Sequence, residues 1–243
     1  ATCLSACTVA GNWTLTSVDD VANQVGRYAS IDLDPASGVL HVSYYDSTAL
    51  DLKYARCDFP ATACDAQAEW TKMTIDTSGD SGRWSSIALG AGRPHVAYSS
   101  GATLKHAWCD AGDATCATSL AAWSFETVTN NDVSANYGEY ASLGVAPAGA
   151  SGATDRVHVS YYDAGTGGGR LEYGVREGGA WTVSVLDDTA NAVGLWTALA
   201  VDTAATAPAR RYVHVAYYEG GAATQLKYLR FDPNSIDSDC NGW

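Results

Sequence analysis

The sequence predicts an all-β protein, organised as a four-bladed β-propeller in which an N-terminal strand closes the last blade. Three observations predict this fold: a composition of strand and turn residues, a fourfold repeat of short alternating segments, and cysteine pairs at the same point of two repeats. The chain has 24 glycines, 14 tyrosines and 8 tryptophans in 243 residues. Aromatic and β-branched residues favour strands, and glycine favours turns.

The repeat is visible when the chain is aligned on its tryptophan segments, which begin at residues 12, 69, 122 and 180. Each is followed by a glycine-aromatic segment, then by a histidine segment such as "VLHVSYYD", then by a segment such as "LDLKYA". Four short alternating segments in a repeat of 53 to 58 residues are typical of a propeller blade. A β-sandwich with an accidental internal similarity is the alternative.

The glycine-aromatic segment is expected to be the innermost strand, because it has the most small residues and strands crowd near a propeller axis. The histidine segment is then second, the "LKYA" segment third and the tryptophan segment outermost. One domain spans 1–243, and segment 12–18 supplies the outer strand of the last blade, which leaves no dangling edge. The four blades are expected at about residues 26–76, 82–128, 138–186 and 194–231.

The cysteines indicate an oxidising compartment. Cys57 with Cys64, and Cys109 with Cys116, bracket six residues at the same point of two repeats, which predicts two local disulfides and a secreted or periplasmic protein. Metal thiolates are the alternative, although the spacing is wide for a zinc knuckle. By the same spacing, Cys7 is expected to pair with Cys240 and latch the ring; a Cys3–Cys7 bridge is the other possibility.

The charge balance limits the partners. The net charge is −13 and the sequence pI about 4.5, so we expect no nucleic acid and no anionic membrane surface as a partner. No apolar run approaches the roughly 20 residues that span a bilayer, so no membrane insertion is expected. We expect a monomer that binds a carbohydrate or a protein.

The stretch "YASIDLDPASGVLHVSYYDSTALDLKYA" resembles the bacterial extracellular propeller repeats related to the sialidase-type (BNR) blade. The resemblance covers all four repeats and implies a propeller fold. The chain has no Asp box of the form S-x-D-x-G-x-T-W, and only Arg27 and Arg83 occupy equivalent inner positions. The resemblance therefore implies the fold and not a sialidase activity.

Four histidines occupy one equivalent position of the repeat. Fourfold symmetry would bring their imidazoles to one height around the axis, where they could hold Zn, Cu, Ni or Fe. Alternatively, each histidine bonds a backbone group or a hydroxyl of its surroundings, four times over. The fifth histidine, His106, replaces a tyrosine of the third segment and is expected to have no role of its own. The four are His41, His95, His158 and His214.

The inner strands begin at the predicted channel mouth, where an aromatic residue follows a variable one in every repeat. Aromatic rings with a few charges are suited to stacking on sugars and orienting their hydroxyls; wedging between blades is the alternative role. Glu139 is the acid at this position and the best candidate for an acid/base residue. The predicted ligand-binding residues are Arg27, Tyr28, Arg83, Trp84, Glu139, Tyr140, Leu195 and Trp196.

The loops that enter the inner strands are rich in carboxylate and amide oxygens, which suit Ca²⁺, although Asp and Asn are also ordinary turn residues. The sequence therefore predicts a secreted module that binds a carbohydrate or protein ligand at the mouth, with or without a Ca²⁺ or transition-metal ion. A metal- or carboxylate-dependent hydrolase or lyase is the alternative. The loop residues are Asp19, Asp20, Asn23, Asp76, Asp80, Asn131, Asp132, Asn136, Asp187, Asp188 and Asn191.

Overall fold

The computed structural model of the chain shows an all-β fold. It describes residues 2–3, 13–20, 23–128, 138–146, 155–165, 168–189, 192–202, 212–221 and 224–233. Each repeat forms one antiparallel sheet whose strands follow one another in chain order. The short helices α1 (Asp113–Cys116), η2 (Gln67–Glu69) and η3 (Leu120–Ala122) lie between strands. No helix in the described part of the chain is long and apolar enough to cross a membrane.

In the first three sheets the strand order is the predicted one, from the glycine-aromatic strand to the tryptophan strand, and the fourth sheet has the first three of these strands among the described residues. The first sheet comprises β3 (Val25–Leu33), β4 (Val39–Asp46), β5 (Asp51–Asp58) and β6 (Thr71–Asp76). The second comprises β7 (Ser81–Gly90), β8 (Arg93–Ser100), β9 (Thr103–Cys109) and β10 (Trp123–Thr127). The third comprises β11 (Glu139–Ala146), β12 (Arg156–Asp163), β13 (Arg170–Glu177) and β14 (Ala180–Asp187). The fourth comprises β15 (Val193–Val201), β16 (Val213–Glu219) and β17 (Gln225–Phe231), and a two-stranded sheet of β1 (Thr2–Cys3) and β2 (Trp13–Thr14) precedes the first.

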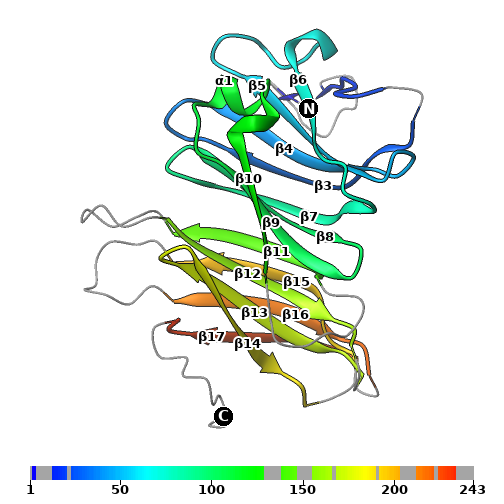
Figure 1. Cartoon of the computed structure of the whole chain (residues 1–243), viewed down its shortest axis with the longest axis vertical. Coiled ribbons are helices and arrows are strands. Elements are labelled where there is room, and N and C mark those ends of the chain that lie inside the picture. The colour runs from blue at the N-terminus through cyan, green and yellow to red at the C-terminus, as the bar shows by residue number, and fades with distance from the viewer. Residues whose placement is uncertain are drawn as a thin grey trace.

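The four sheets are stacked in chain order, with the first sheet at one end of the molecule and the fourth at the other (Figure 1). Successive inner strands contact one another, β3 with β7, β7 with β11, and β11 with β15. The second and third sheets separate the first from the fourth (Figure 1). The described chain is therefore an open stack of blade-like sheets, and its first and last sheets do not meet in a ring.

Apolar side chains fill the three interfaces between adjacent sheets. Leu52 and Tyr54 of β5 pack against Ile87, Val96 and Tyr98 of the second sheet. Burying one such leucine contributes about 1.5–3 kcal/mol, so three repeated interfaces supply most of the core. The second interface contains Leu104, Leu143, Val157, Val159 and Tyr161, and the third contains Leu171, Tyr173, Val213, Val215 and Tyr217.

Two predicted disulfides are confirmed: Cys57–Cys64 and Cys109–Cys116. Each disulfide loop also holds the tryptophan that opens the outer strand. Trp123 Nε1 donates to the backbone oxygen of Cys116 at 2.8 Å, and Trp70 makes the equivalent bond at 3.3 Å. This hydrogen bond between the tryptophan side chain and the second cysteine of the disulfide explains the regular spacing of the two residues. The expected pairings of Cys7 lie outside the described residues.

The expected closure by segment 12–18 is corrected by the structure. β2 pairs with β1, and the fourth sheet has three strands among the described residues. Cys3 faces Trp13 in the register in which Cys109 faces Trp123 in the second sheet. Cys3 therefore occupies the place beside β2 that the end of β17 would need. Among the described residues, β2 thus pairs with β1 and does not complete the last sheet.

Candidate functional site

The glycine-aromatic step of every inner strand is a β-bulge. In the first sheet Arg27 faces Tyr45 and Ser30 faces Ser43, so two residues of β3 oppose one residue of β4. The same register shift occurs in the other three sheets. The glycine that precedes each bulge has a positive φ, between 81° and 109°. The bulge therefore recurs in all four sheets.

The first residue of each bulge is aromatic and has a left-handed backbone. Tyr28, Trp84, Tyr140 and Trp196 have φ values of 53°, 55°, 55° and 47°. In bulges of this kind the left-handed position is usually glycine, and a bulky residue there costs of order 1–3 kcal/mol. Four such costs at equivalent positions indicate that the rings themselves have a role, because glycine would fit the backbone better.

These four aromatic side chains form one continuous row across the four sheets, hereafter the aromatic row. The ring centroids lie 4.3 Å apart for Tyr28 and Trp84, 4.2 Å for Trp84 and Tyr140, and 4.9 Å for Tyr140 and Trp196. Neighbouring rings are tilted by 46° to 48°. The structure thus brings together the aromatic half of the predicted ligand-binding set.

The row is partly open to solvent. Tyr28, Trp84 and Tyr140 are half-buried, whereas Trp196 is 61% exposed. Trp196 also meets Tyr218 of β16 edge to face, with ring centroids 5.6 Å apart. Leu195, its half-buried neighbour, supplies an apolar side chain beside the ring. The fourth-sheet end of the row therefore presents a fixed, accessible indole.

A charged group flanks the row at the second sheet. Arg83 donates from Nε to Asp80 Oδ1 at 3.0 Å, and its Nη2 lies 2.7 Å from Asp80 Oδ2. The Tyr45 hydroxyl donates to the same carboxylate at 2.6 Å, and burial together with this bond raises the pKa of Tyr45. Arg27, its counterpart in the first sheet, is exposed and reaches Gln24 Oε1 at 3.4 Å. The two arginines thus differ in how firmly they are held.

Glu139 is half-buried beside the row. Burial raises the pKa of the Glu139 carboxyl, and the charge of Arg83 acts in the opposite direction. Burial, followed by the charge of Glu139, also raises the pKa of Tyr140 and Tyr162. The Glu139 carboxyl thus places two acceptor oxygens beside the row.

The four equivalent histidines bond within their own sheets. Each Nδ1 lies within hydrogen-bond distance of a side chain on the third strand, two residues before the one that faces the histidine in the strand register. Burial lowers the pKa of His41, and burial together with His106 and Arg93 lowers the pKa of His95 to about 2. The Nδ1 atoms of His41, His158 and His214 meet the hydroxyls of Tyr54, Tyr173 and Tyr228 at 2.7, 2.6 and 2.8 Å, and that of His95 meets His106 Nε2 at 3.1 Å.

Within the described ranges, no three His, Cys, Asp or Glu side chains gather where they could hold a metal ion. The predicted tetrad, His41, His95, His158 and His214, is therefore distributed over four sheets. An imidazole bonded to a neighbouring side chain of the same sheet corresponds to the structural role that the sequence allowed. These residues link the second strand of each sheet to the third.

His106, expected to be without a role, lies in a buried chain of polar groups. Its Nδ1 meets Glu126 Oε1 at 2.9 Å, and the same oxygen accepts from Arg176 Nε at 2.6 Å and Trp181 Nε1 at 2.7 Å. Burial opposes ionisation of Glu126, but the bonds from His106 and Arg176 lower its pKa overall. The sequence signal was present, because Glu126 faces His106 across β9 and β10.

The loop acids proposed for calcium mostly hold the next sheet in place. Asp76 accepts from the Tyr98 hydroxyl at 2.7 Å and from Lys105 Nζ at 3.1 Å. Asn23 donates to Asp46 at 3.2 Å, whereas Asp20 and Asp188 are exposed. The equivalent contacts join Asp19 to Tyr44 and Lys53, and Asp187 to Tyr217 and Lys227. Asn131, Asp132, Asn136 and Asn191 lie outside the described residues.

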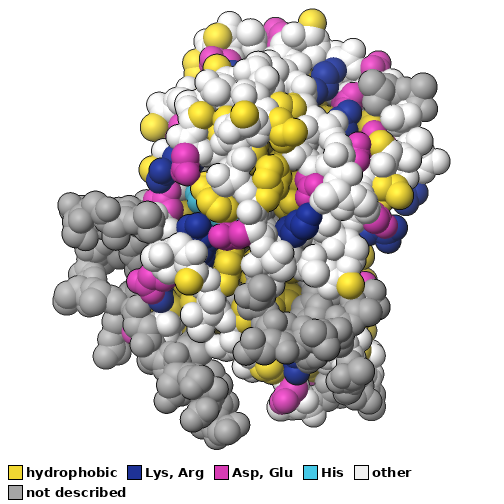
Figure 2. Space-filling view, viewed as in Figure 1, with side chains coloured by type: hydrophobic (Ala, Val, Ile, Leu, Met, Phe, Trp, Pro, Cys, Tyr) yellow, Lys and Arg dark blue, Asp and Glu magenta, His cyan; other side chains and the backbone are white. Residues whose placement is uncertain are grey.

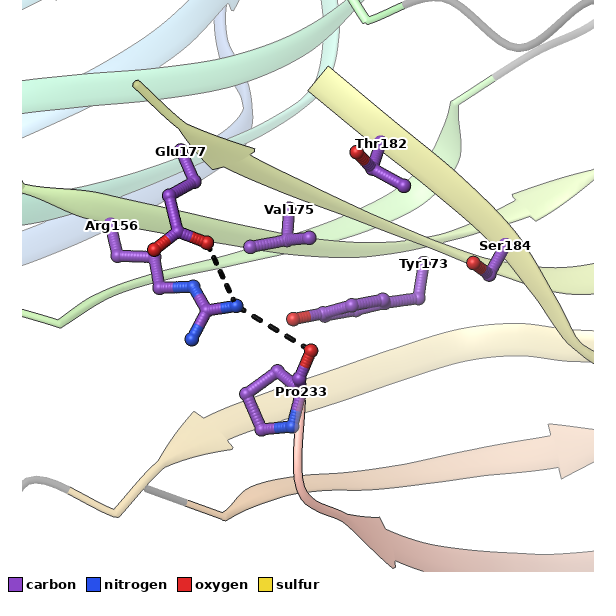
Figure 3. A pocket seen from close by; sticks show the side chains of 7 residues that line it. All are labelled: Arg156, Tyr173, Val175, Glu177, Thr182, Ser184 and Pro233. Atoms are coloured by element: carbon purple, nitrogen blue, oxygen red, sulfur yellow. Dashed lines mark hydrogen bonds and ion pairs between the residues drawn. The ribbon is translucent and has the colours of Figure 1, made fainter. Parts of the chain in front are cut away.

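A pocket of about 270 Å³ lies on the third sheet, next to the segment that follows β17 (Figure 3). Arg156 Nη2 lies 3.2 Å from Glu177 Oε2 and 3.5 Å from the Pro233 oxygen. The ionic groups of the pocket thus pair with each other, and the aromatic row is the stronger candidate site. The pocket is lined by Arg156, Tyr173, Val175, Glu177, Thr182, Ser184 and Pro233.

No family model matches the chain, and no curated protein matches it. Among solved structures it is similar to a GH62 hydrolase in complex with xylotriose, with 11% identity, a TM-score of 0.48 and coverage of 86% of this chain and 66% of that chain. It is also similar to a variant of the Aleuria aurantia lectin in complex with Fucα1-6GlcNAc, with 13% identity, a TM-score of 0.45 and coverage of 85% and 64%. The chain spans just under two thirds of the length of these structures.

Proposed function

We propose that the chain is a carbohydrate-binding protein that uses the aromatic row to recognise a neutral oligosaccharide. The observation that carries the proposal is the set of four bulges that hold Tyr28, Trp84, Tyr140 and Trp196 in a left-handed backbone and in ring contact. Aromatic faces pack against the apolar faces of sugar rings, and fixed rings lose little entropy on binding.

Polar groups beside the row suit sugar hydroxyls. The guanidinium of Arg83, held by Asp80, is a fixed donor, and the Glu139 carboxyl supplies acceptor oxygens. The net charge of −13 disfavours anionic ligands, so a neutral glycan fits better than an acidic one. Figure 2 shows acidic and basic side chains interspersed with apolar ones on one face of the described molecule, rather than one block of positive charge.

The proposal includes the setting of the protein. Two disulfides favour a secreted or periplasmic location. The four sheets are, in this proposal, propeller-type blades in an open arrangement. A protein ligand would use the same aromatic surface.

The experiment is affinity electrophoresis through gels that contain xylan, a β-glucan or a mannan. We expect retardation in at least one neutral polysaccharide and about tenfold weaker binding for Trp196→Ala, the range of a well-placed aromatic contact. Phe125→Ala is the matched control, because Phe125 is 41% exposed on β10, away from the row. Equal retardation of Trp196→Ala and wild type would refute the proposal.

A hydrolase or lyase is the second candidate, and the raised pKa of Glu139 favours it. The same polysaccharides separate the two functions. An enzyme releases reducing ends or unsaturated products, and Glu139→Gln abolishes the release while gel retardation persists. A binding protein releases no product in either form.

A further inference from the structure

The two ends of the stack expose residues that are buried at every internal interface. Leu226 of β17 is 81% exposed, and Tyr228 is 63% exposed. The equivalent leucines of the first three sheets, Leu52, Leu104 and Leu171, are 0%, 1% and 0% exposed. The outer face of the fourth sheet is therefore one half of an interface of the internal kind.

The outer face of the first sheet exposes the other half of such an interface. Ile31 of β3 is 62% exposed and Leu33 is 47% exposed. Ile87 and Leu143, the counterparts of Ile31, are 5% and 6% exposed because the preceding sheet covers them. Leu89 and Val145, the counterparts of Leu33, are half-buried. Isolated apolar residues on a surface are common, but these belong to a position that is otherwise covered.

Glycines at the bulges show that the two halves fit. A Cβ on Gly82 would lie 2.8 Å from the Leu52 Cα of the preceding sheet, and one on Gly26 would meet nothing within 4 Å. Gly26 and Leu226 are thus the unmatched members of a pair that recurs three times. The other two pairs are Gly138 with Leu104, whose Cα would lie 3.2 Å from the added Cβ, and Gly194 with Leu171, whose Cα would lie 2.7 Å from it.

The exposed half is already ordered for docking. His214 Nδ1 bonds the Tyr228 hydroxyl at 2.8 Å, as His41 bonds Tyr54 at 2.7 Å inside the first interface. An interface whose side chains are fixed beforehand loses less entropy on association.

We propose that the outer face of the fourth sheet binds the outer face of the first sheet of a second copy, head to tail. Leu226 would lie against Gly26 of that copy, and Tyr228 near its Ile31 and Leu33. The two faces of one molecule lie at opposite ends of the stack (Figure 1). A second copy can therefore cover either face while the internal interfaces stay in place. This contact replaces the closed monomeric ring expected from the sequence and is independent of sugar binding.

The contact between copies is weaker than the internal interfaces for a specific reason. Inside the stack a serine hydroxyl of each inner strand accepts the backbone N–H of the next inner strand. In the fourth sheet Ala198 takes this position and has no hydroxyl to offer Ile31. The three internal bonds join Ser30 to Ile87 at 3.1 Å, Ser86 to Leu143 at 3.0 Å and Ser142 to Leu199 at 2.9 Å.

The test is sedimentation velocity of the purified chain over a wide concentration range. Wild type is expected to associate reversibly, whereas Leu226→Asp and Ile31→Asp each remain monomeric. A mixture of these two variants should form a complex of two chains, because each keeps one intact face. Ala198→Ser should tighten association about three- to tenfold by restoring the missing bond. Leu120→Asp is the matched control, since Leu120 is 51% exposed on η3.

Wild type that stays monomeric at every concentration would overturn the proposal. Monomeric wild type with a large loss of thermal stability in Leu226→Asp would assign the face to closure within one chain. Association that persists in Leu226→Asp, or that the mixture fails to restore, would rule out head-to-tail pairing of these faces.

Discussion

At the scale of single residues, the aromatic row is maintained against the preference of the backbone. Tyr140 has a φ of 55°, where a Cβ is disfavoured, and its ring contacts Trp84 and Trp196. Ring contacts of this kind contribute about 0.5–1.5 kcal/mol each beyond buried area. Contacts on both sides of the ring are thus large enough to offset the backbone cost.

Substitutions at Tyr140 should show the strain directly. Both Tyr140→Ala and Tyr140→Gly remove the ring, but only glycine relieves the left-handed backbone. We expect the glycine variant to be more stable than the alanine variant by about 1 kcal/mol in urea unfolding. At Phe125, a strand position without positive φ, the order should reverse. An alanine variant at Tyr140 as stable as the glycine variant would mean that the bulge is not strained.

The sequence predicted the members of the row but not their geometry. The residues Tyr28 and Trp196 followed from the repeat, whereas a bulge adds one residue to a strand without changing its composition. For the same reason the partners of the histidines were not predicted, because pairing His41 with Tyr54 requires the register between β4 and β5. His106 was given no role of its own, although its carboxylate partner, Glu126, faces it on the neighbouring strand β10.

At the scale of elements, a carboxylate at the end of an outer strand binds a tyrosine and a lysine of the next sheet. Asp187 receives the Tyr217 hydroxyl at 2.6 Å and Lys227 Nζ at 2.9 Å. Burial opposes its ionisation, but bonds from Thr189 and these partners lower the pKa of Asp187 to about 2. The lysine belongs to the "LKY" segment of the repeat, so the same repeat supplies both the carboxylate and its cationic partner.

Removing this carboxylate should weaken the interface between the third and fourth sheets. We expect Asp187→Asn to lower the free energy of unfolding by about 1–3 kcal/mol at neutral pH, because Lys227 loses its buried partner. The pKa of Asp187 is lowered on folding, so its contribution is full above pH 3.8 and is lost as pH falls towards 2. The check is urea unfolding at neutral pH and near pH 2. The control is Asp188→Asn, because Asp188 is exposed. Equal effects of the two variants would contradict a role of Asp187 in joining the third and fourth sheets.

At the scale of the whole molecule, a ring and an open stack use the same interface. The repeat in the sequence fixes which residues face each other between adjacent sheets, and both arrangements bury Leu52 against Gly82. The angle between sheets, which decides closure, depends on side-chain fit along the whole interface. The pairing of Cys3 with Trp13 was missed because a two-residue strand has no period to detect.

Stacking the sheets also turns four local bulges into one linear surface. The bulge residues are separated by 56 positions in each repeat, so every sheet adds one ring to the row. Head-to-tail docking would place Trp196 of one copy near Tyr28 of the next and lengthen the row. A longer row would match a longer oligosaccharide, and sugar binding should then be measured on the monomeric Leu226→Asp variant as well.

The central claim is that the aromatic row contacts the sugar. The most direct measurement is a ¹H–¹⁵N spectrum of the indole N–H groups during titration with a neutral oligosaccharide from the retarding polysaccharide. The account predicts that the signals of Trp84 and Trp196 shift on binding. Those of Trp70 and Trp123, whose N–H groups are bonded to Cys64 and Cys116, should stay in place. Shifts confined to Trp70 and Trp123, with Trp84 and Trp196 unchanged at saturation, would contradict it.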